Sequence, residues 1–166
     1  MKRVVIDTNV LCVANGQSPQ AGPACMLQVV ERLDAVRKDD QVCLDQTGFI
    51  LNEYLKQRLS LSGQPGVGDA FFKWLFQNQA NPQHCRKVEV TPLNDEGTEF
   101  AEFPSDRRLA RFDPADRKFV AVSRASGRRP AVVLNAVDSD WWECRQALQA
   151  CGVPVEFLCP AQFTEQ

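Results

Sequence analysis

Val4-Val5-Ile6-Asp7-Thr8, near the start of the chain, predicts the first element of the fold. The three β-branched residues form a short apolar run, which is typical of a strand buried on both faces of a parallel sheet. The run stops at an acidic residue, Asp7. Because functional sites in open parallel sheets form beyond the carboxyl ends of the strands, Asp7 is the first candidate site residue.

Further apolar runs follow with helical segments between them, and the alternation predicts an α/β domain with a mostly parallel sheet. Strands are expected at residues 4–6, 42–44, 87–91, 131–134 and 155–158. Helical spacing of apolar residues is present at 24–36, 49–59, 71–76 and 140–151, and a further helix is expected to start at Asp113-Pro114 and to end near Gly127. Loops are expected at 15–23 and 63–68 because of their Gly and Pro content, and residues 93–97 can start a short helix.

The composition fits one soluble globular domain spanning residues 1–166, with 44% hydrophobic and 24% charged residues. The formal net charge is −2, so overall positive charge does not hold the chain on nucleic acid or on an anionic membrane. No apolar stretch approaches the roughly 18 residues of a membrane span, and the first residues do not resemble a secretory signal. We therefore expect a cytoplasmic protein without membrane association.

The cysteines give no sign of paired spacing. There are seven of them, an odd number, and no two are separated as in a C-x-x-C pair. Disulfide frameworks and zinc sites usually show such pairing, so we expect reduced thiols that pack in or near the core. The neighbours His84 and Cys85 form a loop pair rather than a set of metal ligands on this interpretation.

Several acids besides Asp7 fall near the expected ends of strands. Asp138 and Asp140 follow the strand at 131–134, Asp116 lies in the first turn of the preceding helix, and Glu53 lies on the helix after the second strand. Converging carboxylates repel one another and need protons or a counter-charge. A hard divalent cation such as Mg²⁺ supplies that charge and prefers oxygen ligands. Metal-activated hydrolysis of phosphodiesters is the chemistry that this pattern favours.

Each acid also has an ordinary structural explanation. Asp7 can end a strand in a turn, Asp116 can stabilise the helix dipole, and Asp140 can cap the helix that begins at residue 141. A glutamate such as Glu53 on an amphipathic helix is usually solvated. Asp45 and Asp113 are expected to be helix caps rather than ligands.

Taken in chain order, these acids and their neighbours resemble the PIN domain (PilT N-terminus), a family of metal-dependent nucleases. The resemblance runs from residue 4 to about residue 158. The matching segments are the first strand with Asp7, residues 50–54 with Glu53, residues 116–122 with Asp116, and residues 138–141 with Asp138 and Asp140.

The resemblance implies a three-layer sandwich around a central, mostly parallel sheet of four to five strands. The catalytic residues that it implies are Asp7, Glu53, Asp116 and Asp138. The ligands that it implies for Mg²⁺ or Mn²⁺ are Asp7, Asp116, Asp138 and Asp140, with Asn9 and Asn135 supporting them. Proteins that this chain resembles are commonly endoribonucleases that cleave single-stranded RNA, and many are toxins restrained by an antitoxin protein. Homodimers are also common among them.

Basic residues concentrate in one segment, residues 107–129. It holds eight of the nineteen basic side chains and only two acids, a local net charge of +6. Because the segment flanks Asp116, it is expected to form a basic rim that holds RNA at the acidic site. The residues expected to bind RNA are Arg111, Arg117, Lys118 and Arg124. For any single arginine, a solvated helix face or loop is the simpler interpretation.

Two other functions remain open at this point. A PIN-like domain with weak or no catalysis would use its arginine-rich segment to bind RNA or a protein. A phosphoacceptor domain would take a phosphoryl group on Asp7, but no acid pair precedes that residue, which weakens this third hypothesis.

Overall fold

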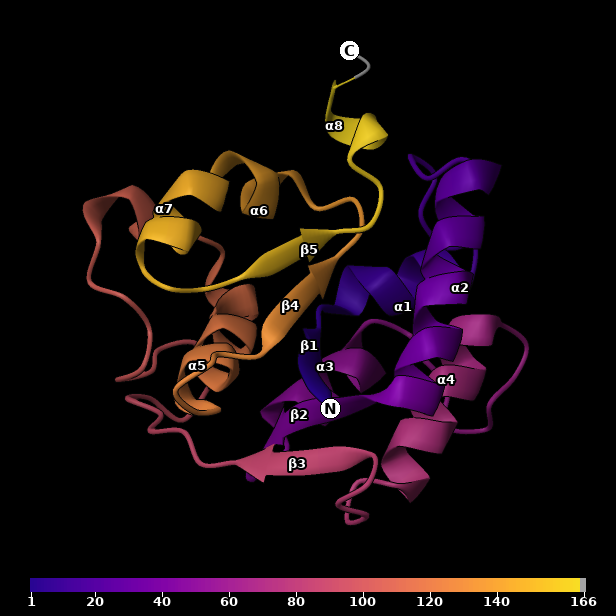
Figure 1. Ribbon diagram of the computed structural model, residues 1–166, viewed down its shortest axis with the longest axis horizontal. Helices are drawn as coiled ribbons and strands as arrows, with labels where there is room; N and C mark the ends of the chain where they lie inside the picture. Colours follow the sequence, from indigo (N-terminus) through magenta and orange to yellow (C-terminus); the bar gives the residue numbers. More distant parts are fainter. Residues whose placement is uncertain (165–166) are drawn as a thin grey trace.

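The central element of the fold is a five-stranded, wholly parallel sheet, seen in a computed structural model that describes residues 1–164 (Figure 1). Its strand order is β3-β2-β1-β4-β5. The strands are β1 (Lys2–Ile6), β2 (Asp40–Asp45), β3 (Cys85–Val88), β4 (Val132–Asn135) and β5 (Val155–Phe157). The predicted α/β class with a parallel sheet is confirmed, and β1 lies at its centre between β2 and β4.

Helices cover both faces of the sheet, which makes the domain a three-layer sandwich (Figure 1). One layer contains α1 (Thr8–Ala14), α2 (Pro23–Asp39) and α4 (Val67–Gln77). The opposite layer contains α5 (Arg117–Ala125), α6 (Ser139–Glu143) and α7 (Arg145–Ala150). The helices lie on opposite faces because crossovers between parallel strands are right-handed, so crossovers that run in opposite directions across the sheet place their helices on different faces. The chain moves one way across the sheet from β1 to β3, and the other way from β4 to β5.

Four further helices complete the part of the chain that the structure describes. They are α3 (Phe49–Lys56), α8 (Ala161–Thr164) and two 3₁₀ helices at Arg107–Leu109 and Pro114–Asp116. Asp45 caps α3 as predicted, because its carboxylate accepts from the backbone N–H groups of Gly48, Phe49 and Ile50. Tyr54 on α3 donates from its hydroxyl to the carbonyl of Ile6 at 2.6 Å, which fixes this helix against the end of β1.

Some boundaries differ from the sequence-based expectation. The third strand ends at Val88. Beyond it, the backbone N–H of Val90 donates to the side chain of Gln46 instead of to a neighbouring strand, and the chain leaves the sheet. The helix expected at 140–151 is interrupted at Cys144. No helix forms at 93–97, where the Asn94 side chain instead accepts the N–H of Thr98 in a turn. Helix α1 was not predicted, since seven residues are too few for a clear period.

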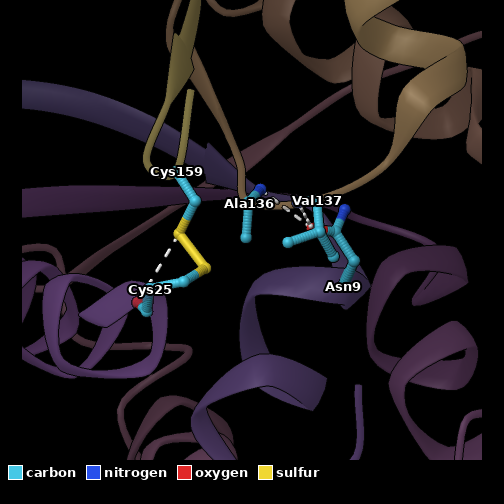
Figure 2. The surroundings of a disulfide bond; sticks show 5 residues. All are labelled: Asn9, Cys25, Ala136, Val137 and Cys159. Carbon is cyan, nitrogen blue, oxygen red and sulfur yellow. Dashed lines mark hydrogen bonds between the residues drawn. A yellow bond between two sulfur atoms is a disulfide. The ribbon is translucent and has the colours of Figure 1, made fainter. Parts of the chain in front are cut away.

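The cysteine expectation is wrong for one pair. Cys25, near the start of α2, forms a disulfide with Cys159, which follows β5, and both are buried. Figure 2 draws this bond together with its surroundings, which include Asn9, Ala136 and Val137. The two cysteines are 134 residues apart, so spacing could not reveal the pair, and only the fold brings the end of β5 to the start of α2. The other five cysteines are free thiols.

Within residues 1–164, no helix has the length and apolar character needed to cross a lipid bilayer.

Candidate metal centre

Three acids from distant parts of the sequence meet at one end of the sheet. Asp7 directly follows β1, Asp116 ends the 3₁₀ helix before α5, and Asp138 lies in the loop after β4. Each offers a carboxylate oxygen, and the three oxygens lie within 4.8 Å of one another. They lie at the carboxyl ends of β1 and β4. From β1 the chain adds strands toward one edge of the sheet, and from β4 it adds a strand toward the other edge, so the strand order reverses between these two neighbours. Crevices at this point are where open α/β sheets bind ligands.

Two asparagines fix the carboxylate of Asp7. Its Oδ2 accepts from Asn9 Nδ2 at 2.6 Å and from Asn135 Nδ2 at 3.0 Å. Asp7 is only 2% exposed, so these hydrogen bonds replace water that the buried carboxylate has lost. Asn9 lies on α1 and Asn135 ends β4, and these are the two asparagines for which the resemblance implies a supporting role.

Asn9 also connects this carboxylate with the loop that carries Asp138. Its Oδ1 accepts from the backbone N–H groups of Ala136 and Val137, at 2.8 and 3.0 Å. Figure 2 shows these two hydrogen bonds beside the disulfide between Cys25 and Cys159. Asn9 thereby fixes the position of Asp7 relative to the loop that carries Asp138.

Helix ends position the other two acids. Asp113 caps the 3₁₀ helix at Pro114–Asp116 through the N–H of Ala115 at 3.0 Å, which places Asp116 at the end of that turn. Asp138 caps α6 by accepting the N–H of Asp140 at 3.0 Å. The cap of this helix is therefore Asp138, and Asp140 does not take the capping role that was considered for it.

Burial, together with the close approach of the carboxylates, raises the pKa values of the three acids. Burial, followed by the charge of Asp138, raises the pKa of Asp7 to about 8. Burial together with the neighbouring carboxylates of Asp7 and Asp138 raises the pKa of Asp116 to about 10. Burial also raises the pKa of Asp138, and the hydrogen bond from the backbone N–H of Asp140 offsets part of this effect. Without a counter-charge, this cluster holds protons at neutral pH.

The triad opens into a polar cleft of about 400 Å³. Besides the acids, its wall includes Thr8, Cys12 and the loop residues 17–20 that precede α2. The sequence does not predict this wall, because a loop of Gln, Ser and Pro carries no motif that distinguishes it from other loops. Four buried side-chain atoms within residues 1–164 lack a hydrogen-bond partner, and two of them are Thr8 Oγ1 and Asn135 Oδ1. Both belong to residues next to Asp7 in space or sequence.

Glu53, the fourth predicted acid, lines the same cleft but is not part of the triad. Its Oε2 accepts a hydrogen bond from Lys118 Nζ at 3.0 Å, and the two side chains form a buried ion pair. Lys118 is only 6% exposed. Its predicted place on an exposed RNA-binding rim is therefore wrong, because its charge is used inside the protein to balance Glu53.

Asp140, predicted as an additional ligand, belongs neither to the triad nor to the cleft wall that the structure defines within residues 1–164. The backbone N–H of Asp140 donates to the carboxylate of Asp138, which caps α6. The set of acids that the fold brings together is thus smaller than the predicted one.

The predicted basic rim does not surround the cleft. Arg117 donates to the carbonyls of Ala110 and Phe112 and lies over the ring of Phe103. Arg124 donates to the carbonyl of Glu102. These carbonyls belong to the irregular segment between β3 and α5, where few backbone groups have partners in helices or strands, so side chains supply the donors. Arg111 is exposed and does not line the cleft.

Comparison with known proteins does not place the chain in a group: no family model, no curated protein and no solved structure matches it. The chemistry of the site therefore has to be inferred from its own geometry.

Proposed function

We propose that the chain is a metal-dependent endoribonuclease with a PIN-like site that hydrolyses phosphodiester bonds of single-stranded RNA, with Mg²⁺ or Mn²⁺ as cofactor. The observation that carries the proposal is the convergence of Asp7, Asp116 and Asp138 within 4.8 Å at the switch point of the sheet. By the same resemblance, the chain would be the toxin of a toxin–antitoxin pair.

The residues present fit a hard divalent cation. The triad offers only oxygen donors, and its three carboxylates carry more negative charge than the site can hold without protons or a cation. Thr8 Oγ1 and Asn135 Oδ1 add two unpartnered polar atoms beside Asp7, and these could hold ordered water. A bound cation would supply a Lewis acid for a phosphoryl oxygen and would make a water a stronger nucleophile.

The protein's own groups have separate tasks in this proposal. Asn9 and Asn135 orient Asp7, so that the ligand geometry exists before the substrate binds. Lys118 holds the Glu53 carboxylate at the cleft wall, where it can accept a hydrogen bond from water in the cleft. The uncharged loop residues 17–20 offer amide and hydroxyl groups to a nucleotide without adding charge to the acidic site.

The direct test is cleavage of a labelled single-stranded RNA with Mg²⁺, with Mn²⁺ and with EDTA, for the wild-type protein and for Asp7→Asn. We expect cleavage with either cation, none with EDTA, and a large loss in the variant. Asp34→Asn is the matched control, because Asp34 is an exposed acid on α2 whose ion pair within residues 1–164 is with Lys38. Equal cleavage by Asp7→Asn and the wild-type protein would contradict the proposal.

One observation favours a second candidate, a PIN-like binding module with weak or no catalysis. The ion pair with Lys118 neutralises Glu53, so the cleft has one free acid fewer than the resemblance implies. RNA binding without cleavage under any of the metal conditions would support this alternative.

A further inference from the structure

A second cavity lies at the opposite end of the same two strands. It measures about 580 Å³, and its wall includes four basic side chains, Lys2, Arg3, Arg128 and Arg129. Lys2 begins β1, and the loop that carries both arginines leads into β4, so this basic cavity lies at the amino ends of these strands. The last part of the basic segment 107–129 is therefore at the far end of the sheet from Asp116, which it was predicted to flank.

Few acids balance these charges. Among its described lining residues the cavity has no acid. Lys2 lies 3.5 Å from Glu156, but the other carboxylate oxygen of Glu156 accepts from Arg32 at 2.7 Å. Arg3 donates to the carbonyl of Ser126 at 3.2 Å, which orients its guanidinium without neutralising it.

The two remaining arginines are free to bind a ligand. Arg128 and Arg129 are exposed, and neither forms an ion pair within residues 1–164. Gathering four cations around one cavity is unfavourable unless an anion occupies it. Guanidinium groups match the geometry of phosphate oxygens through paired hydrogen bonds, which makes phosphate the anion that this lining recognises best.

The rest of the wall is apolar. Met1, Pro130 and Val132 contribute its other side chains, which gives the cavity one surface for charge and another for a sugar or a base. A volume of this size is within the range of roughly 300–1,000 Å³ that is typical of sites for small organic ligands. A nucleotide unit matches both properties better than a bare inorganic anion does.

We propose that the basic cavity binds phosphate groups of a single-stranded nucleotide chain, as an attachment site separate from the acidic cleft. The choice of a nucleotide chain as the ligand rests on the proposed function, whereas the phosphate chemistry rests on the cavity alone. The five residues of β1 separate the two sites by roughly 15–20 Å, so the attachment site would contact nucleotides remote from the cleaved bond.

The test is binding of a labelled 20-nucleotide single-stranded RNA in EDTA, where the proposed cleavage does not occur, by fluorescence anisotropy at several salt concentrations. We compare the wild-type protein with Arg128→Gln/Arg129→Gln. The control is Arg86→Gln/Lys87→Gln, which removes the same charge from exposed positions on β3. All four changed side chains are exposed, and thermal unfolding verifies that both variants fold.

We expect the Arg128/Arg129 variant to bind about tenfold more weakly at low salt, and the control to change less than about twofold. The slope of log affinity against log salt should become shallower by about 1.4, because each lost contact with a single strand contributes about 0.7. A slope equal to that of the wild-type protein would overturn the proposal.

Competition distinguishes the sources of phosphate. An unlabelled oligonucleotide should displace the labelled RNA at micromolar concentration, and a nucleoside monophosphate or inorganic phosphate only at much higher concentration. Displacement by inorganic phosphate as efficiently as by the oligonucleotide would instead assign a free-anion site and overturn the assignment. Because binding is measured in EDTA, a failure of the proposed cleavage would not change the interpretation of this result.

Discussion

The carboxyl ends and the amino ends of β1 and β4 differ in charge and also in how their side chains are held. At the carboxyl ends, Asp7 is buried and oriented by two asparagines. At the amino ends, Arg128 and Arg129 are exposed and have no acidic partner within residues 1–164. Buried side chains in a fixed orientation are suited to catalysis at one bond of a substrate. Exposed cations are suited to binding a polyanion, because each of them adds a similar amount to the affinity. One end should therefore respond sharply to a single substitution, and the other end only in proportion to the charge removed.

The largest effect should follow the loss of an acid at the carboxyl ends. Removing a group that only supports a ligand typically costs 10–100-fold, so we expect Asp138→Asn to lower RNA cleavage by more than about 100-fold. Asp138 also caps α6, and an asparagine keeps an acceptor for that N–H group, which separates the loss of charge from the loss of the cap. The measurement is the single-turnover cleavage rate at saturating Mn²⁺. A loss below fivefold would remove the contrast between the two ends.

The disulfide should stabilise the region around the carboxyl ends without affecting RNA attachment at the amino ends. We expect Cys25→Ser/Cys159→Ser to lower the free energy of unfolding by about 2–4 kcal/mol, because the bond closes a long loop. Cys144→Ser, which removes a free thiol, is the control. Chemical denaturation gives the difference, and RNA affinity in EDTA should stay unchanged. Equal stability of the double variant and the control would show that the bond contributes nothing.

Asn9 should control the affinity for the cation. Asn9→Ala removes the hydrogen bond to Asp7 and both acceptor contacts with the loop before Asp138. Loss of such a supporting group should weaken Mn²⁺ binding by about 10–100-fold. Asn52→Ala, at an exposed position on α3, is the matched control. Calorimetric titration measures both affinities, and an unchanged affinity in Asn9→Ala would show that the asparagine does not position the ligand.

A smaller effect concerns stability and pH. Since the pKa of Asp7 is raised by burial and by Asp138 to about 8, well above the ordinary value of 3.8, the folded protein binds more protons than the unfolded chain between these values. The stability of the cation-free protein should therefore fall as pH rises from about 4 to about 8. At pH 8, Asp7→Asn should be more stable than the wild-type protein by about 1–2 kcal/mol without a cation.

Thermal unfolding at pH 5 and pH 8, with and without Mn²⁺, checks this prediction. The cation should stabilise the wild-type protein more at pH 8 than at pH 5, because fewer protons compete for the carboxylates. Asp34→Asn should behave like the wild-type protein at both values. Equal stabilisation at both pH values would contradict the raised pKa of the cluster.

The sequence predicted the parts of the molecule that depend on local pattern. Apolar runs located the five strands, and the acids after two of them led to Asp7 and Asp138. The helix start at Asp113 placed Asp116 correctly, because capping is a local interaction. These predictions succeeded because a parallel sheet brings the carboxyl ends of its strands to one edge.

The remaining features depend on contacts between distant residues. Lys118 lies 65 residues from Glu53, and nothing near either residue indicates their ion pair. The basic segment looked continuous in the sequence, but α5 runs the length of the sheet and carries Arg128 away from Asp116 (Figure 1). The pairing of Cys25 with Cys159 likewise requires the completed fold.

The most direct test of the central claim is calorimetric titration of Mn²⁺ into the wild-type protein and into Asp7→Asn at pH 7.5. If the triad is a metal centre, the wild-type protein binds Mn²⁺ with saturable heat, and the variant binds at least about 100-fold more weakly, beyond the cost of losing a supporting group. Binding of equal affinity in both proteins, or no saturable binding to the wild-type protein, would contradict the assignment of this site.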